Sequence, residues 1–220
     1  MSPLVKAVQD SWHQGRWRTA AVHLLAVAPF LLLIHAAWTN NLTINPIQEA
    51  TIRSGRYALY LLLISLACTP LYNLFGWREP VRLRRTLGLY TFGYATLHVF
   101  IYAVLDFGLQ WEWLLENTFR KPYTLVGFAA FTILLLLAVT SFRWWMKRLG
   151  RNWKRLHRFV YLAGALVILH YGWAVKGDFW TLQGETQRPF FFGLVLLLLL
   201  AARLPIVKRT AQSYRAKMRR

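Results

Sequence analysis

Histidine is the residue type in this chain whose chemistry and placement point most directly to function. Five of the six histidines lie in or near long apolar segments; in chain order the six are His13, His23, His35, His98, His157 and His170. An ionisable side chain is costly inside a membrane and is functional there by default, and a neutral imidazole is a standard ligand of haem iron. Because Cys68 is the only cysteine, no C-x-x-C-H attachment motif exists, and we expect any haem to be b-type.

Two of these histidines lie at nearly the same predicted depth. The apolar segments of His98 and His170 are expected to enter the membrane from the cytoplasm, near Thr86 and Leu156. At about 1.5 Å per residue, His98 lies about 18 Å and His170 about 21 Å along its helix. The two imidazoles can therefore face each other across a porphyrin and ligate one iron. With both axial positions filled, such a site passes electrons and does not activate oxygen.

The alternative interpretation is a pair of buried histidines that hydrogen-bond to neighbouring helices. Small residues on the same two segments are equally ambiguous, because they either leave room for a macrocycle or allow close helix packing. They are Gly88, Gly93 and Ala95 on the first segment, and Ala163, Gly164, Ala165 and Gly172 on the second.

His157 and Arg56 are two further candidates for cofactor binding. His157 precedes His170 by about 20 Å along the predicted helix, so it would ligate a second haem with an unusual partner, line a flavin or quinone pocket, or lie at the interface as a snorkelling side chain. Arg56, about one turn inside the membrane, would pair with haem propionates or anchor its helix at the interface. We expect interfacial positions for His23 and His35.

The segments that must position these side chains are helices of a polytopic membrane bundle. Hydrophobic residues make up 56% of the 220-residue chain and charged residues only 16%, and the apolar residues gather in blocks of membrane-spanning length. We predict an all-α, single-domain fold over residues 1–220, because the blocks lack the alternation of a β-barrel. The six predicted transmembrane helices cover about 19–38, 50–69, 86–107, 122–142, 156–175 and 189–207.

The distribution of charge predicts the orientation of the bundle. The net charge is +19, and most lysines and arginines fall in the two termini, in 78–85 and in 143–158. By the positive-inside rule these segments face the cytoplasm, so both termini are predicted to be cytoplasmic. The charge does not indicate nucleic acid binding, since no amphipathic basic face, zinc-finger spacing or RNA-binding motif accompanies it.

Motifs that are missing limit the chemistry further. No glycine-rich dinucleotide or P-loop motif occurs, and no hydrolase motif is present. We therefore expect a non-catalytic relay that receives electrons from quinol or from a separate flavoprotein. Two other hypotheses stay open: a stand-alone ferric or quinone reductase, and a transporter without redox chemistry that uses His98 and His170 as proton or metal sites.

Three motifs carry a resemblance to a known family. They are Y-A-T-L-H-V around His98, N-W-K-R-L-H-R-F-V-Y around His157, and H-Y-G-W beginning at His170. The chain resembles the ferric-reductase-type transmembrane domain, and within it the MsrQ (YedZ) group of haem-binding subunits of periplasmic methionine sulfoxide reductase systems. The wider group usually has four histidine ligands and a fused dehydrogenase domain, whereas this chain lacks that domain and one ligand position.

The resemblance implies cofactors, partners and a location. The cofactors are haem b and FMN, so iron and a flavin would both be present. Electrons would come from the quinone pool or a cytoplasmic flavin reductase. They would pass to a periplasmic molybdopterin subunit, MsrP, which forms a heterodimer with its membrane partner and reduces methionine sulfoxide in oxidised proteins. The implied location is the cell inner membrane, as a multi-pass protein.

Overall fold

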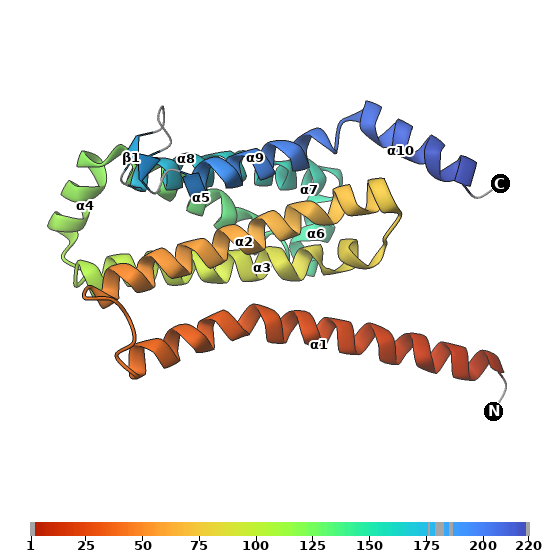
Figure 1. Ribbon diagram of the computed structural model, residues 1–220, viewed down its shortest axis with the longest axis horizontal. Coiled ribbons are helices and arrows are strands. Elements are labelled where there is room, and N and C mark those ends of the chain that lie inside the picture. Colours follow the sequence, from red (N-terminus) through yellow and green to blue (C-terminus); the bar gives the residue numbers. More distant parts are fainter. Residues whose placement is uncertain (1–2, 176, 179–182, 185–186, 219–220) are drawn as a thin grey trace.

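The computed structural model describes residues 3–175, 177–178, 183–184 and 187–218 (Figure 1). Almost all of this part of the chain is helical, which confirms the predicted all-α class. The described part also contains turns, loops and an antiparallel pair of two-residue strands, β1 (Gly177–Asp178) and β2 (Gln183–Gly184). The longer helices are α1 (Pro3–Trp38), α2 (Pro46–Phe75), α3 (Glu79–Phe100), α5 (Pro122–Val139), α8 (Val160–Ala174), α9 (Gln187–Ala201) and α10 (Pro205–Met218). The shorter ones are a π-helix η1 (Ile101–Asp106), α4 (Trp111–Arg120), α6 (Arg143–Leu149), α7 (Arg151–Leu156) and a 3-10 turn η2 (His157–Phe159).

Local sequence signals explain where α2 begins and ends. The Asn45 side chain caps its start by accepting a hydrogen bond from the Gln48 N–H at 3.1 Å, and Pro46 occupies the first turn, where a missing N–H costs little. Gly76 ends the helix in the left-handed conformation, with φ of 77°, and donates its N–H to the Tyr72 carbonyl.

The second predicted span was expected to end at Pro70, but α2 continues through it to Phe75. A proline inside a helix removes the hydrogen bond to the carbonyl four residues earlier, here that of Leu66. In the structure, the Arg203 guanidinium donates to this carbonyl at 2.5 Å. The orphaned acceptor is thereby satisfied inside the bundle, so the helix need not end at the proline.

The sixth predicted span, 189–207, is also corrected by the structure. Helix α9 ends at Ala201, and α10 starts at Pro205 with its axis bent by 66°. The proline at the start of α10 lacks the N–H that would continue α9. The fifth predicted span begins with the 3-10 turn η2 and continues as α8, which has 15 residues.

Several helices are suited to cross a membrane. Among the residues that the structure describes, four helices are long and apolar enough to do so, and the bent pair of α9 and α10 raises the number to five if it counts as one span. The chain is therefore a multi-pass membrane protein, and the prediction of six spans is confirmed only in part. Figure 1 shows both ends of the chain at one end of the bundle, together with α6 and α7, and α4 at the opposite end.

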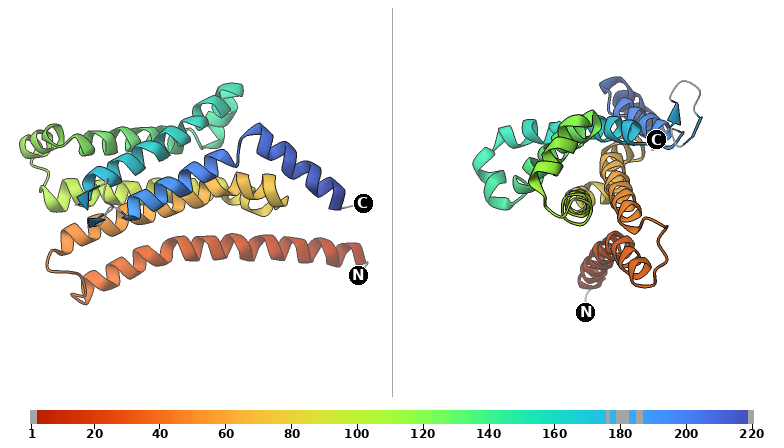
Figure 2. Two further views of the ribbon diagram at one scale, coloured as in Figure 1. Left: turned by 45° about the horizontal axis from the view of Figure 1, so that its top comes forward. Right: turned by 90° about the vertical axis from the view of Figure 1, so that its left-hand side faces the viewer.

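The bundle is built from two helical hairpins, α2 with α3 and α5 with α8, and α9 packs against α8. Its buried core contains Leu59, Leu62, Leu63, Leu66, Leu134, Ala163 and Leu196. Helix α1 runs along the edge of the bundle (Figures 1 and 2). It is joined to α3 by two hydrogen bonds, from the Tyr94 hydroxyl to the Ala26 carbonyl at 2.7 Å and between His23 and the Tyr90 hydroxyl at 2.8 Å.

Candidate functional site

The structure brings His98 of α3 and His170 of α8 together inside the bundle. Their ring centroids lie 6.1 Å apart, and the ring planes are nearly perpendicular, at 82°. His98 is near the end of α3 and His170 near the end of α8, so the pair lies toward the end of the bundle that carries α4. Two segments distant in the sequence thus place two imidazoles at one level.

Each imidazole is oriented by a main-chain carbonyl of a neighbouring helix. The Nδ1 atom of His98 lies 2.8 Å from the Thr51 carbonyl oxygen of α2, and Nδ1 of His170 lies 2.7 Å from the Tyr123 carbonyl oxygen of α5. A carbonyl only accepts, so each Nδ1 must carry the proton, and each Nε2 keeps its lone pair. A histidine that ligates a metal typically donates its other N–H in this way, which fixes the ring and raises its basicity.

A glycine makes room for each ring. A Cβ atom at Gly55 would lie 3.0 Å from His98 Nδ1, and one at Gly127 would lie 2.6 Å from His170 Nδ1. Real Cβ contacts essentially never fall below 3.0 Å, so at Gly127 no larger residue fits without a shift. These two glycines allow α2 and α5 to approach the histidines closely enough for the carbonyl hydrogen bonds.

The two half-sites repeat one arrangement. In each, a carbonyl is followed four residues later by the glycine, and 47 residues separate the carbonyl from its histidine. The α5–α8 hairpin therefore copies the α2–α3 hairpin, as in membrane proteins built from internal repeats. Sequence reasoning missed both glycines, yet a signal was available: Gly55 and Gly127 are the only glycines in the predicted spans 50–69 and 122–142.

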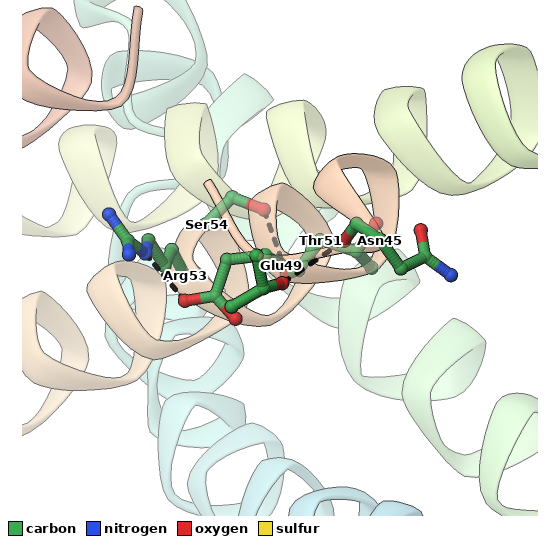
Figure 3. A network of polar contacts seen from close by, with 6 residues as sticks. Asn45, Glu49, Thr51, Arg53 and Ser54 are labelled. Carbon is green, nitrogen blue, oxygen red and sulfur yellow. Dashed lines mark hydrogen bonds and ion pairs between the residues drawn. The ribbon is translucent and has the colours of Figure 1, made fainter. Parts of the chain in front are cut away.

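A polar network fixes the start of α2, which supplies the first carbonyl (Figure 3). The buried Ser54 hydroxyl donates to the Thr51 carbonyl at 2.9 Å, so this oxygen serves both Ser54 and His98. One turn around, Arg53 and Glu49 form an ion pair at 2.7 Å. These contacts hold the first turns of α2 in one geometry and with them the carbonyl that orients His98.

Arg56 follows Gly55 directly and lies at this end of α2. Its Nε atom is buried and has no hydrogen-bond partner among the residues that the structure describes. A buried donor of this kind calls for an acceptor from a ligand or an ordered water. A carboxylate-bearing cofactor beside His98 would supply one.

His157 lies in a different environment, at the other end of α8. Its ring stacks on Trp153 at 4.0 Å between centroids, and its Nε2 lies 3.2 Å from the Thr140 hydroxyl. That hydroxyl donates to the Leu136 carbonyl at 2.6 Å, so it accepts the proton of His157 Nε2. In this arrangement the Nε2 lone pair is not offered to a metal, in contrast to His98 and His170.

The remaining histidines do not join the site. His23 and His35 are exposed on α1, and the side chain of His13 lies outside the described residues. Across the described ranges, no three side chains among His, Cys, Asp and Glu gather into a metal site. The His98–His170 pair therefore suits a metal that arrives with its own equatorial ligands, as iron does in haem.

Comparison with known proteins agrees with this architecture. A family model described as the ferric reductase like transmembrane component matches residues 54–168, which is more than half of the chain. The chain is 45% identical over 163 residues to the protein-methionine-sulfoxide reductase heme-binding subunit MsrQ of Xanthomonas axonopodis pv. citri, covering 71% of this chain and 75% of that protein. The chain belongs to the MsrQ family.

Other MsrQ proteins match over a similar or greater length. The MsrQ of Xanthomonas campestris pv. campestris strain B100 is 42% identical over 189 residues, which cover 83% of this chain and 84% of that protein. The MsrQ of Ralstonia nicotianae is 45% identical over 162 residues, covering 72% and 75%. All three carry the name of a heme-binding subunit.

Proposed function

We propose that this chain is a haem b electron-transfer subunit and that His98 and His170 are the two axial ligands of one haem. The observation that carries the proposal is the pair of neighbouring imidazoles, each held at Nδ1 by a carbonyl. With 6.1 Å between the ring centroids, the two side chains are near enough to hold one iron together.

The haem would supply a one-electron carrier, and the protein would hold it. Thr51 and Tyr123 keep both rings in the tautomer that offers Nε2, and Gly55 and Gly127 provide the space. Arg56 would pair its buried Nε with a propionate carboxylate, an interaction that is strong where water is scarce. With both axial positions filled by imidazole, the site favours electron transfer over oxygen chemistry.

The name of the relatives supports a proposal about the electron donor and acceptor of this chain. Those relatives are subunits of a protein-methionine-sulfoxide reductase, so we propose that this chain passes electrons to a periplasmic molybdopterin reductase, MsrP, as a heterodimer. The donor would be the quinone pool or a cytoplasmic flavin reductase, and FMN would be a second cofactor. His157 would serve this second, donor-side cofactor.

We also propose six spans in the inner membrane with both termini in the cytoplasm. The fifth would be η2 with α8, and the sixth α9. Helices α6, α7 and α10 carry many basic residues and lie at the same end as both termini, which fits the positive-inside rule. His98 and His170 would then lie nearer the periplasmic face, on the side of the electron acceptor.

The test is a pyridine haemochrome assay with flavin extraction on the purified full chain. We expect a Soret band and b-type bands in the unaltered protein and in His35→Ala, which changes an exposed histidine on α1. His98→Ala and His170→Ala should each lose these bands. A colourless protein that keeps its helical circular dichroism would overturn the haem proposal and favour a proton or metal transporter. Absence of FMN in the extract would overturn the flavin alone.

A further inference from the structure

Two arginines reach the same stretch of α2 at the end of the bundle opposite the histidine pair. Arg203, in the bend between α9 and α10, donates to the Leu66 carbonyl of α2 at 2.5 Å and to the Tyr161 hydroxyl of α8, with its guanidinium 4.9 Å from the Tyr161 ring centroid. Arg84 of α3 donates to the Thr69 hydroxyl at 3.4 Å, one turn further along α2. Their acceptors, Leu66 and Thr69, lie three residues apart on α2, so both guanidinium groups are held beside the same turn of that helix.

None of these contacts supplies a negative charge. The acceptors of Arg84 and Arg203 are carbonyl or hydroxyl oxygens. The sequence has no aspartate or glutamate in 57–75, 140–175 or 187–220, and on α3 itself the acidic residue Glu79 pairs with Arg82 at 3.4 Å. At the histidine end, by contrast, Arg53 pairs with Glu49 at 2.7 Å and Arg120 with Glu116 at 2.6 Å.

Other features add positive potential at the same place. Helix α8 starts at Val160, beside Tyr161, and α10 starts at Pro205, two residues after Arg203. The N-terminus of a helix carries a partial positive charge. The Nε atom of Arg203 is buried with no partner among the described residues, so one donor of the cluster is still unused.

Partly buried like charges without a counter-ion are costly, and within the part of the chain that the structure describes neither Arg84 nor Arg203 forms an ion pair with an acidic side chain. We propose that Arg84 and Arg203 bind a phosphate group at the basic end of the bundle. Guanidinium groups match phosphate oxygens with paired hydrogen bonds, and basic pockets between membrane helices take anionic headgroups. The phosphate belongs either to an anionic phospholipid or to a soluble phosphomonoester such as FMN. The site is independent of the haem proposal.

Sequence reasoning missed Arg203 because it counted the residue only as part of a basic cytoplasmic end. The signal was its position inside the predicted span 189–207, where an arginine is rare and usually has a partner or a function.

The test measures bound phosphate on the full chain purified in detergent. After extensive washing, phospholipid phosphorus in the organic extract and flavin in the aqueous extract are each counted per chain. Arg84→Gln is the decisive variant, because its hydrogen bond to Thr69 is long, at 3.4 Å, and its loss should disturb the fold little. Arg203→Gln is the second variant, and Arg155→Gln is the control, since it removes one exposed charge from α7 at the same end.

We expect the unaltered chain and Arg155→Gln to retain about one phosphate-bearing molecule. Arg84→Gln and Arg203→Gln should each weaken its retention about tenfold or more, the scale of a lost hydrogen bond between charged groups. Loss from the organic extract identifies a lipid headgroup, and loss from the aqueous extract identifies FMN. Soret absorbance should stay unchanged in Arg84→Gln, because the histidine pair lies at the other end. Equal phosphate in Arg84→Gln and Arg155→Gln would overturn the proposal.

Discussion

The two hairpins of this protein hold their histidines by the same device but with different clearance. In α2–α3 the hypothetical Cβ at Gly55 would be 3.0 Å from the imidazole, and in α5–α8 the one at Gly127 would be 2.6 Å away. The first half-site also has a second donor, Ser54, on its orienting carbonyl. The α5–α8 half-site therefore has less space beside its histidine, and the α2–α3 half-site has an additional hydrogen bond on its carbonyl. Single substitutions can measure how much each feature contributes to haem binding.

Gly127→Ala should have the largest effect of these substitutions. The added methyl cannot fit beside His170, so the ring or α5 must move and the hydrogen bond to the Tyr123 carbonyl must lengthen. Overpacking typically costs about 1–3 kcal/mol, which weakens haem binding by about 5- to 150-fold. Haem titration of the apoprotein measures this. Unchanged affinity would show that the clearance at Gly127 has no bearing on the site.

Gly55→Ala should give a smaller loss of haem affinity. A contact of 3.0 Å is at the limit of what real Cβ atoms show, and His98 can relieve it by a shift of a few tenths of an ångström. We expect a weakening of roughly two- to fivefold, at or below the lower end of the range for overpacked cores. The same titration applies, and an effect larger than that of Gly127→Ala would reverse the order of the two half-sites.

Ser54→Ala tests the hydrogen bond between Ser54 and the Thr51 carbonyl and leaves both histidines unchanged. Loss of its hydroxyl removes the hydrogen bond to the Thr51 carbonyl, and a typical hydrogen bond contributes about 0.5–1.5 kcal/mol. We expect a lower melting temperature in detergent, with haem content unchanged. Haem loss without any change in melting temperature would mean that Ser54 acts on the cofactor directly.

Gly93→Ala should have the smallest effect and the opposite sign. No heavy atom lies within 4 Å of a Cβ at this position in α3, although the helix is the one that carries His98. Alanine in a helix is more favourable than glycine by about 0.5–1 kcal/mol. Melting temperature should therefore rise slightly while haem affinity stays the same. A loss of haem here would show that any change in α3 disturbs the site. The effects of Gly55→Ala and Gly127→Ala could then no longer be assigned to their contacts with the histidines.

Much of the helical organisation could be predicted from apolar blocks, because the membrane forces each block to satisfy its own backbone hydrogen bonds. The end of the second span was predicted wrongly, because a side chain far away in the sequence determines where that helix ends. Helix α2 passes Pro70 because Arg203, far along the chain, takes the carbonyl that the proline leaves free. The bend after Ala201 has a local signal in Pro205, but Pro205 lies within a long apolar block, which was therefore predicted as one continuous helix.

The candidate site divides in the same way. Depth along two helices predicted His98 and His170 at one level from the sequence alone, and the structure places their rings 6.1 Å apart. Their orientation could not be predicted, because a backbone carbonyl of any helix is equally able to accept, and only the packing selects Thr51 and Tyr123. The third candidate, His157, lies at the other end of α8 with its Nε2 3.2 Å from the Thr140 hydroxyl, and its role as a ligand stays a prediction.

The most direct test of the central claim is the haem content of His98→Ala, of His170→Ala and of the double variant, measured side by side. If the two imidazoles bind one iron, each single substitution removes the same haem as the double substitution. If each single variant loses one part of the haem and the double variant loses the sum, the histidines belong to separate sites and the account is contradicted.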